Sequence, residues 1–387
     1  MKVRLFLLSA IAIIYSGCQS NLCQEIDAVS SLAAEQCVIL SSKLDENKMP
    51  RTFQCDTLVQ SNLKAWTSGF FPGTCWYAYM LIKDDALKAI AIEQTEKMVQ
   101  PTQYLTDHDA GFQVMCSLGH AYKNTGEEKY RLGIKEAAEF LAGRYSAKTG
   151  VIKSWDHKHF EYPVIIDNMM NLELLTYASR EFGVQQWMDI AISHADVTMR
   201  NHFREDGSSY HLVNYDPETG EVIQKVTVQG YSDDSAWSRG QSWGLYGYTM
   251  MYDETGYERY LNHAEKIASY LLMRLKDRPI PAWDFDADHE SIAQTDASAA
   301  AVMASAFIRL STLTKDKNKA KCYLSQAEAI MCALMQPEFL ASSGEVGGFI
   351  LKRSTGFYKN SREVNVPLTY ADYYFLEALY NYKSLSR

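Results

Sequence analysis

Apolar and polar positions in this chain recur in a pattern of paired helices. In each copy, an apolar stretch at helical spacing ends near an aromatic residue, a short turn follows, and a second helix begins. A hairpin of this kind cannot bury its apolar face alone, so it stacks against its neighbours. Clear copies span residues 120–141, 177–195, 250–271 and 307–329. Weaker copies lie near residues 79–98 and close to the N-terminus.

Glycines mark three of the turns. Gly126, Gly183 and Gly256 each follow an apolar helical stretch. They suit the left-handed backbone position that commonly closes a helix. The pattern therefore predicts where three of the first helices end.

The spacing of the copies favours a closed ring. They recur every ~55 to 75 residues, which is longer than the repeat of common open helical arrays. The extra length lies in aromatic-rich segments, which we expect to be loops, at residues 66–76, 154–168 and 210–243. Six hairpins closing on themselves predict an all-α fold, the (α/α)6 toroid, with these loops gathered at one end. An open α-solenoid that binds a partner is the structural alternative.

Composition supports one large domain. No linker, charge block or low-complexity run interrupts the 387 residues, and 47% of them are hydrophobic. We expect a tether and first helix over residues 18–50 and a single catalytic domain over residues 51–387. The net charge of -9 argues against binding to nucleic acid or docking on an anionic membrane. An acidic ligand must therefore be met by local cations.

The N-terminus is typical of an export signal. A basic start precedes an apolar run from Leu5 to Tyr15, which is too short to span a bilayer. The stretch Tyr15-Ser16-Gly17-Cys18 resembles a bacterial lipobox. Residues 1–17 are therefore expected to be a signal peptide, and a lipid on Cys18 to be the chain's contact with a membrane. Without acidic residues directly after Cys18, we expect an exported lipoprotein facing the periplasm. An ordinary cleaved signal is the alternative.

The eight cysteines show no metal-site spacing, because no CxxC and no Cys/His cluster occurs. Cys23, Cys37 and Cys55 can form one disulfide in an oxidising compartment, with the pairing open. The remaining cysteines are expected to be buried thiols: Cys75, Cys116, Cys322 and Cys332.

Two carboxyl groups stand out in the loops. Asp109 follows His108 at the start of a helix, where a carboxylate is either a simple cap or a functional group. Asp167 follows an apolar run and opens the next apolar helix. Burial there raises a carboxyl pKa and prepares the group to donate a proton near neutral pH. Asp167 is therefore the leading candidate for a general acid.

The loops also hold side chains suited to sugars. Trp66 lies beside glycines, where a flat ring can stack on the C–H face of a pyranose, whereas Phe70 and Phe71 are expected to plug the core. A denser cluster offers stacking, hydroxyl hydrogen bonds and a guanidinium fork for a carboxylate. Its members are His211, Thr227, Gln229, Trp237, Arg239 and Trp243. His157 and His159 have no third ligand nearby and are expected at the surface.

Together these stretches resemble the unsaturated glucuronyl hydrolases of glycoside hydrolase family 88 over nearly the whole mature chain. The resemblance rests on Trp66-x-x-Gly69-Phe70-x-x-Gly73, His108-Asp109-x-Gly111-Phe112, Asp167-Asn168-Met169-x-Asn171, Ser238-Arg239-Gly240-Gln241-x-Trp243, Asp296-Ala297-Ser298-Ala299-Ala300 and residues 371–379. It implies an (α/α)6 barrel, which agrees with the repeat pattern.

The resemblance also implies an activity. The enzyme would remove the terminal 4,5-unsaturated hexuronic acid from lyase-generated oligosaccharides, with glycosaminoglycan disaccharides favoured. Asp167 would protonate C4 and assist the water that adds at C5, and the hemiketal formed would open and break the glycosidic link. Asp109 would hold ring hydroxyls, and His108 and the cluster from His211 to Trp243 would surround the sugar. The rule that relates carboxylate spacing to stereochemistry does not apply to this chemistry. No metal or organic cofactor is implied.

A basic loop over residues 352–362 lies where related enzymes recognise the neighbouring sugar. We hypothesise that Lys359 or Arg362 contacts a sulfate or carboxylate there. A solvated loop is the alternative.

Three other functions compete with this hypothesis. An unsaturated rhamnogalacturonyl hydrolase would share the fold and chemistry but act on pectin fragments. A sugar epimerase would need paired histidines, and only His108 and His211 lie in the candidate loops. A lipid-anchored glycan-binding protein would explain the tryptophans, but it would not require Asp109 and Asp167. The sequence leaves the oligomeric state and the source polysaccharide open.

Overall fold

The computed structural model describes residues 3–276, 278–288, 294–360 and 362–385, with side chains from Leu22 onward and without that of Arg362. Its helices are α1 Val3–Ser41, α2 Phe70–Ile82, α3 Asp85–Glu96, α4 Ala110–Val114, α5 His120–Thr125, α6 Glu128–Ala142, α7 Asn168–Phe182, α8 Gln185–Asn201, α9 Ser238–Thr255, α10 Glu258–Arg274, α11 Ala297–Leu313, α12 Lys317–Leu334 and α13 Thr369–Leu385. A π-helical turn, Met115–Gly119, joins α4 to α5.

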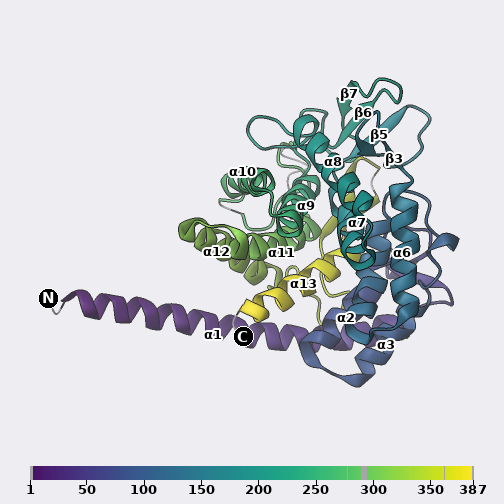
Figure 1. Cartoon of the computed structure of the whole chain (residues 1–387). Coiled ribbons are helices and arrows are strands. Elements are labelled where there is room, and N and C mark those ends of the chain that lie inside the picture. Colours follow the sequence, from purple (N-terminus) through teal and green to yellow (C-terminus); the bar gives the residue numbers. More distant parts are fainter. Residues whose placement is uncertain (1–2, 277, 289–293, 361, 386–387) are drawn as a thin grey trace.

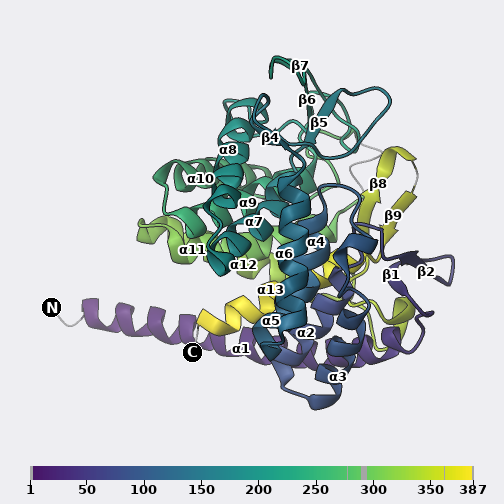
Figure 2. The same cartoon turned by 45° about the vertical axis from the view of Figure 1, so that its right-hand side comes forward.

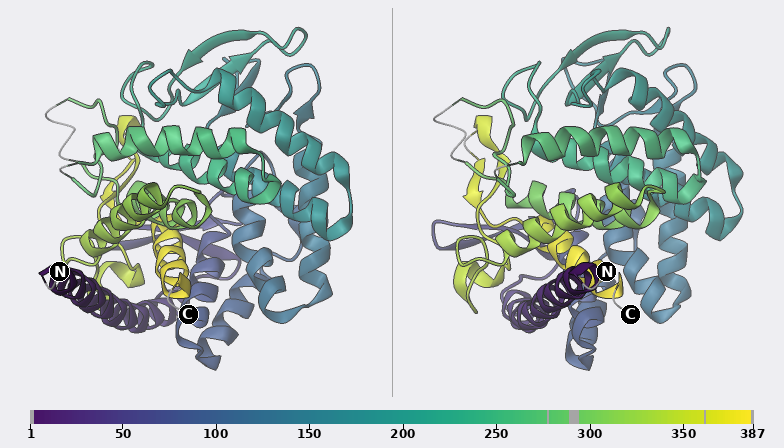
Figure 3. Two further views of the ribbon diagram at one scale, coloured as in Figure 1. Left: turned by 60° about the vertical axis from the view of Figure 1, so that its left-hand side comes forward. Right: turned by 90° about the vertical axis from the view of Figure 1, so that its left-hand side faces the viewer.

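The inner helices form a closed ring (Figures 1 and 3). Helix α2 packs against α13, α13 against α11, α11 against α9, α9 against α7 and α7 against α4. The π-helical turn after α4 returns to α2 and closes the circle. The outer helices α1, α3, α6, α8, α10 and α12 each pack on at least one inner helix. Inner and outer helices alternate along the chain, so the predicted (α/α)6 toroid is confirmed.

The turns follow the predicted backbone chemistry. Gly126, Gly183 and Gly256 close α5, α7 and α9 with φ of 70°, 69° and 68°, as their positions indicated. The turn after α2 uses Lys83 instead, with φ 65°. A lysine carries no glycine signal, which is why this hairpin was the weaker copy in the sequence.

A buried carboxyl group ties the inner helices together near the middle of the ring. Glu377 of α13 accepts hydrogen bonds from the hydroxyls of Tyr77 on α2 at 2.8 Å, Tyr246 on α9 at 3.2 Å and Ser305 on α11 at 2.6 Å. Burial raises the pKa of Glu377 above its ordinary value. One side chain thus joins four of the six inner helices.

The loops contain four small antiparallel sheets that the all-α prediction missed. Their strands are β1 Lys48–Gln54, β2 Thr57–Asn62, β3 Tyr145–Ser146, β4 Val151–Ile152, β5 Tyr162–Ile165, β6 Leu212–Tyr215, β7 Val222–Val226, β8 Ser354–Phe357 and β9 Arg362–Val366. The hairpins β1–β2 and β8–β9 lie side by side (Figure 2) and contact each other through β1 and β9. Two expected loops are also shorter than predicted, because α2 begins at Phe70 and α9 at Ser238.

Helix α1 is anchored by a stripe of buried side chains. Among the described side chains, the stripe begins at Leu22 and continues at helical spacing to Leu40, and the N-terminal part of the helix extends beyond the ring (Figure 1). None of the helices in the described part of the chain is both long and apolar enough to cross a membrane.

The proposed disulfide is absent, since Cys23, Cys37 and Cys55 are free thiols. Cys23 and Cys37 lie on one helix, α1, at a separation of about 21 Å along its axis, far beyond the reach of a disulfide. Cys37 instead lies within hydrogen-bonding range of Cys75 on α2. Cys75 and Cys116 are buried as expected, whereas Cys332 is half-buried and Cys322 is exposed. The prediction was wrong for Cys322, which lies on the outer helix α12.

Candidate active site

A cavity of about 260 Å³ opens at the end of the ring where the inner helices begin. Its lining residues are Arg51, Trp66, Asp107, His108, Asp109, Trp155, Ile165, Asp167, His211, Val228, Gln229, Arg239, Gly356, Phe357, Glu363 and Tyr370. Asp109 and Asp167 directly precede α4 and α7, and Arg239 and Tyr370 are the second residues of α9 and α13. Helix N-termini carry partial positive charge, so this end of the ring favours an anionic ligand.

The Asp167 carboxyl group is buried and aimed at the cavity. It occupies the N-cap position of α7 but accepts no capping hydrogen bond, and its Oδ2 has no hydrogen-bond partner. Burial raises the pKa of Asp167 to about 7, opposed by the charge of His108 and assisted by that of Asp109. The expected desolvation is present. Near neutral pH, this carboxyl group is therefore protonated in a large fraction of the molecules.

Asp109 stands beside it at the start of α4, again without a capping bond. Its Oδ1 lies 3.4 Å from Asn171 Nδ2 and 3.6 Å from His108 Nε2. Burial, and after it the charge of Asp107, raise the pKa of Asp109 well above its ordinary value. A Cβ on Gly111 would lie 2.5 Å from the Cα of Asn171, so only glycine lets α4 approach α7 this closely. The interpretation of Asp109 as a simple helix cap is wrong.

The His211 ring is held in one tautomer. Its Nδ1 accepts a hydrogen bond from the backbone N–H of Val228 at 3.0 Å, so the proton of the neutral ring is on Nε2. Burial lowers the pKa of His211 to about 3. Nε2 has no partner and lies 3.9 Å from Asp167 Oδ2. A water molecule between these two atoms would meet one donor and one acceptor.

Arg239 is a buried clamp. Its Nη1 donates to Asp296 Oδ2 at 2.7 Å and to the carbonyl of Thr355 at 2.6 Å. Its Nη2 donates to Gln229 Oε1 at 3.0 Å and to the carbonyl of Gly356 at 2.7 Å. The fork expected to meet a substrate carboxylate is thus directed at protein groups. It ties α9 to the N-cap of α11 and to β8, and it positions the Gln229 side chain.

The other predicted residues divide into cavity and supporting positions. Trp66, His108 and Gln229 line the cavity. Thr227 does not line it, and its Oγ1 accepts from the N–H of Gly230 at 2.8 Å, which shapes the turn carrying Gln229. Trp237 is buried behind His211, with ring centroids 4.9 Å apart and nearly perpendicular. Trp237 therefore supports the histidine from outside the cavity.

Trp243 lies in the core and not beside the sugar, so this prediction is wrong. Its side chain is 0% exposed and packs against Phe112 and Tyr374. The expected loop is the first turns of α9 at this point, and helical geometry turns Trp243 inward.

Lys359 is exposed in the turn between β8 and β9 and does not line the cavity. The side chain of Arg362 lies outside the described residues, so the anion contact expected for this loop stays a prediction. His157 and His159 are exposed, as predicted. Within the described residues, no group of three or more His, Cys, Asp or Glu side chains forms a metal-binding arrangement.

Sequence reasoning missed the part of the wall contributed by the two hairpins. Arg51 of β1 forms an ion pair with Glu363 of β9, and both residues line the cavity. Nothing local in the sequence marks a pair so far apart. The repeat pattern could have predicted Tyr370 as a cavity residue. It lies at the start of the sixth inner helix, just as Asp109 and Asp167 precede the second and third.

Comparison with known proteins gives one consistent result. The family model described as Glycosyl Hydrolase Family 88 matches residues 41–385. An unsaturated glucuronyl hydrolase from Formosa agariphila is 39% identical over 340 residues, covering 86% of this chain and 84% of that protein. An unsaturated chondroitin disaccharide hydrolase from Streptococcus pneumoniae is 33% identical over 339 residues, covering 85% and 84%. The crystal structure of an unsaturated glucuronyl hydrolase specific for heparin superposes with a TM-score of 0.89 at 42% identity, covering 94% of this chain and 98% of that one.

Proposed function

The chain belongs to glycosyl hydrolase family 88, and on that premise we propose that it removes the terminal 4,5-unsaturated uronic acid from lyase-generated oligosaccharides of the glycosaminoglycan type. The observation that carries the proposal is the Asp167 carboxyl group. It is buried at the cavity wall, its Oδ2 has no partner, and its pKa is raised to about 7. The names of the relatives support the substrate class.

The residues suit hydration of an enol ether. A protonated Asp167 donates its proton to C4, and the positive charge that develops at C5 is shared with the ring oxygen. Water then adds at C5 and returns a proton to the Asp167 carboxylate. His211 Nε2–H holds this water by its oxygen, since it faces Asp167 Oδ2 across 3.9 Å. The C5–O5 bond of the hemiketal then breaks to give a ketone at C5, which leaves a hemiacetal at C1. This hemiacetal collapses to an aldehyde, and the glycosidic oxygen takes up a proton and leaves as the alcohol of the shortened sugar.

The surroundings suit an anionic ring. The uronate carboxylate meets the N-termini of the inner helices, whose partial positive charges are not cancelled by capping carboxylates at α4 and α7. Asp109 lies where it can accept hydrogen bonds from ring hydroxyls, and Trp66 offers a flat face for stacking. These roles follow from the position of each side chain at the cavity wall.

The direct test follows the ultraviolet absorbance of the C4=C5 bond in unsaturated disaccharides. We expect the absorbance to fall on addition of the protein with chondroitin, hyaluronan or heparin disaccharides. A constant absorbance with all three, or loss only with pectin-derived fragments, would contradict the proposed substrate class.

Activity is expected to fall as pH rises through about 7. Donation to C4 needs a protonated Asp167, and the raised pKa keeps the proton on this carboxyl below that pH. Above it, kcat/KM should fall roughly tenfold per pH unit. Initial rates of absorbance loss between pH 5 and 9 measure this profile. A kcat/KM that stays level up to pH 9 would remove Asp167 from the role of general acid.

We also propose that the protein is an exported lipoprotein anchored through Cys18. The sequence Tyr15-Ser16-Gly17-Cys18 supports cleavage before Cys18. Cleavage there would retain the buried side chains of α1 from Leu22 to Leu40. A Cys18→Ser chain should lose fatty-acid labelling and leave the membrane fraction, whereas a Cys23→Ser chain should keep both. Equal labelling of the two variants would dispose of the anchor.

A further inference from the structure

Two further hollows lie beside the catalytic cavity along the β1–β2 hairpin. Arg51 and Glu363 line the cavity and also a neighbouring hollow of about 620 Å³ that includes Lys48. Asn62 is shared between that hollow and a third one of about 500 Å³. Because each pair of neighbours has wall residues in common, the three hollows lie next to one another. We call the two outer hollows the hairpin groove.

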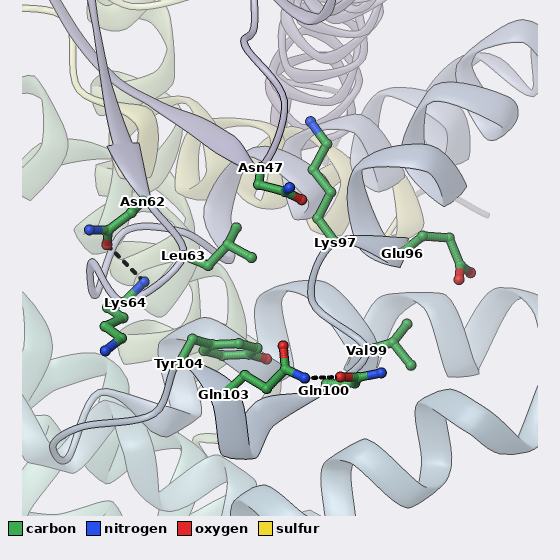
Figure 4. A pocket seen from close by; sticks show the side chains of 10 residues that line it. All are labelled: Asn47, Asn62, Leu63, Lys64, Glu96, Lys97, Val99, Gln100, Gln103 and Tyr104. Atoms are coloured by element: carbon green, nitrogen blue, oxygen red, sulfur yellow. Dashed lines mark hydrogen bonds between the residues drawn. The ribbon is translucent and has the colours of Figure 1, made fainter.

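The far end of the hairpin groove is polar on both sides. Figure 4 shows Asn47, Asn62 and Leu63, at the ends of the hairpin strands, across the hollow from Gln103 and Tyr104. Lys64 and Lys97 also line this end. The side-chain amides of Asn47, Asn62 and Gln103 can hydrogen-bond to sugar hydroxyls, directly or through water.

The charge of the groove differs from that of the whole molecule. The chain carries a net charge of -9, yet the hairpin groove is lined by four cations and two carboxylates: Lys48, Arg51, Lys64, Lys97, Glu96 and Glu363. Glu96 pairs with Lys129 outside the groove, and Glu363 pairs with Arg51. The excess positive charge therefore lies along the hairpin, beside the catalytic cavity.

Two of these cations have hydrogen-bonding capacity left over. Arg51 reaches Glu363 through Nε, and among the described residues its two terminal amino groups make no hydrogen bond. The Arg51 side chain is 40% exposed. Lys48 is half-buried and has no ion pair with any described residue. Both cations are thus placed to meet an anion from outside the protein.

We propose that the hairpin groove binds the sugars beyond the cleaved bond, with Lys48 and Arg51 recognising the carboxylate of the next uronic acid along the chain. The proposal rests on the proposed function for the position of the first, unsaturated sugar. In a polymer that alternates uronic acid with amino sugar, a disaccharide offers one carboxylate and a tetrasaccharide two. The second carboxylate lies on the side of the cleaved bond that leads into the groove. The enzyme therefore prefers tetrasaccharides to disaccharides.

Binding to an Asp167→Asn protein tests this without turnover. Isothermal titration would compare unsaturated hyaluronan disaccharide and tetrasaccharide, which carry carboxylates and no sulfate. We expect the tetrasaccharide to bind more tightly, and Lys48→Gln to lower the ratio of the two affinities about three- to fivefold, the upper part of the range for one exposed charge pair. The ratio should also fall with added salt. Lys135→Gln, an exposed lysine on the outer helix α6, is the matched control and should leave the ratio unchanged.

Equal affinities for the two ligands would contradict the proposed role of the groove. An equal loss of affinity for both ligands in Lys48→Gln would contradict it as well. This outcome is distinct from failure of the proposed function. If the wild type leaves the C4=C5 absorbance unchanged while the tetrasaccharide still binds more tightly, the result supports the groove and contradicts the proposed reaction. If the absorbance falls but Lys48→Gln leaves the affinity ratio unchanged, the result supports the reaction and contradicts the groove.

Discussion

An Asp167→Asn enzyme is expected to lose at least about 10³-fold in kcat on unsaturated disaccharides while binding them within about threefold of the wild type. A positioned general acid or base contributes on the order of 10²- to 10⁴-fold, and here the same group is proposed to serve both steps. Asparagine keeps the shape of the side chain but has no acidic proton to donate at C4. The rate of absorbance loss and the affinity from titration measure the two quantities separately.

Asp107→Asn is the matched control, because Asp107 is another carboxylate at the same cavity. We expect it to lower kcat less than tenfold. An Asp167→Asn enzyme that keeps a tenth of its activity, or an Asp107→Asn enzyme equally inactive, would contradict the assignment.

Loss of folding will not explain the Asp167→Asn result. The raised pKa means that, between about pH 4 and 7, the unfolded chain gives up this proton while the folded protein retains it. The carboxyl group therefore reduces the stability of the wild type as pH rises through this range. Removal of the charge should leave the melting temperature at pH 8 equal or higher.

An Arg239→Met protein is expected to lose about 3–5 kcal/mol of unfolding free energy, the usual cost of leaving one member of a buried ion pair alone. Asp296 is 0% exposed and would lose its cation. The carbonyls of Thr355 and Gly356 would lose their shared donor as well. Urea denaturation measures the change.

Arg259→Met provides the control. Arg259 also forms two hydrogen bonds to one carboxylate, that of Asp196, but on the exposed outer surface. We expect a loss of about 0–1 kcal/mol there. Equal losses in the two variants would show that burial does not decide the energetics. Adding Asp296→Asn to Arg239→Met should recover part of the stability, because the unpaired charge is then gone.

Local signals in the sequence predicted the ring and its two carboxyl groups. Glycines at left-handed positions and helical spacing report on contacts within one hairpin, so the order of helices could be read directly. Asp109 and Asp167 were found because each interrupts an apolar pattern where an inner helix begins. Their separation and their lack of capping bonds depend on the packing of α4 against α7, which no single segment encodes.

Predictions failed where the outcome depends on distant parts of the chain. Arg51 and Glu363 meet only because β1 and β9 come together after the ring closes. Trp237 and Trp243 looked equivalent, yet one supports His211 and the other fills the core, because α9 begins between them. Arg239 looked like a ligand for substrate, but its partners on β8 lie more than a hundred positions later.

The place of Glu377 on the last helix has a consequence for biosynthesis. The side chain that joins α2, α9 and α11 is supplied by α13, which also brings Tyr370 to the cavity. A nascent chain that lacks this helix has an open arc of hairpins and an incomplete catalytic wall. Activity is therefore withheld until translation and folding are complete. In the export proposed above the chain would cross the membrane unfolded, so activity would appear only after the last helix has folded on the far side.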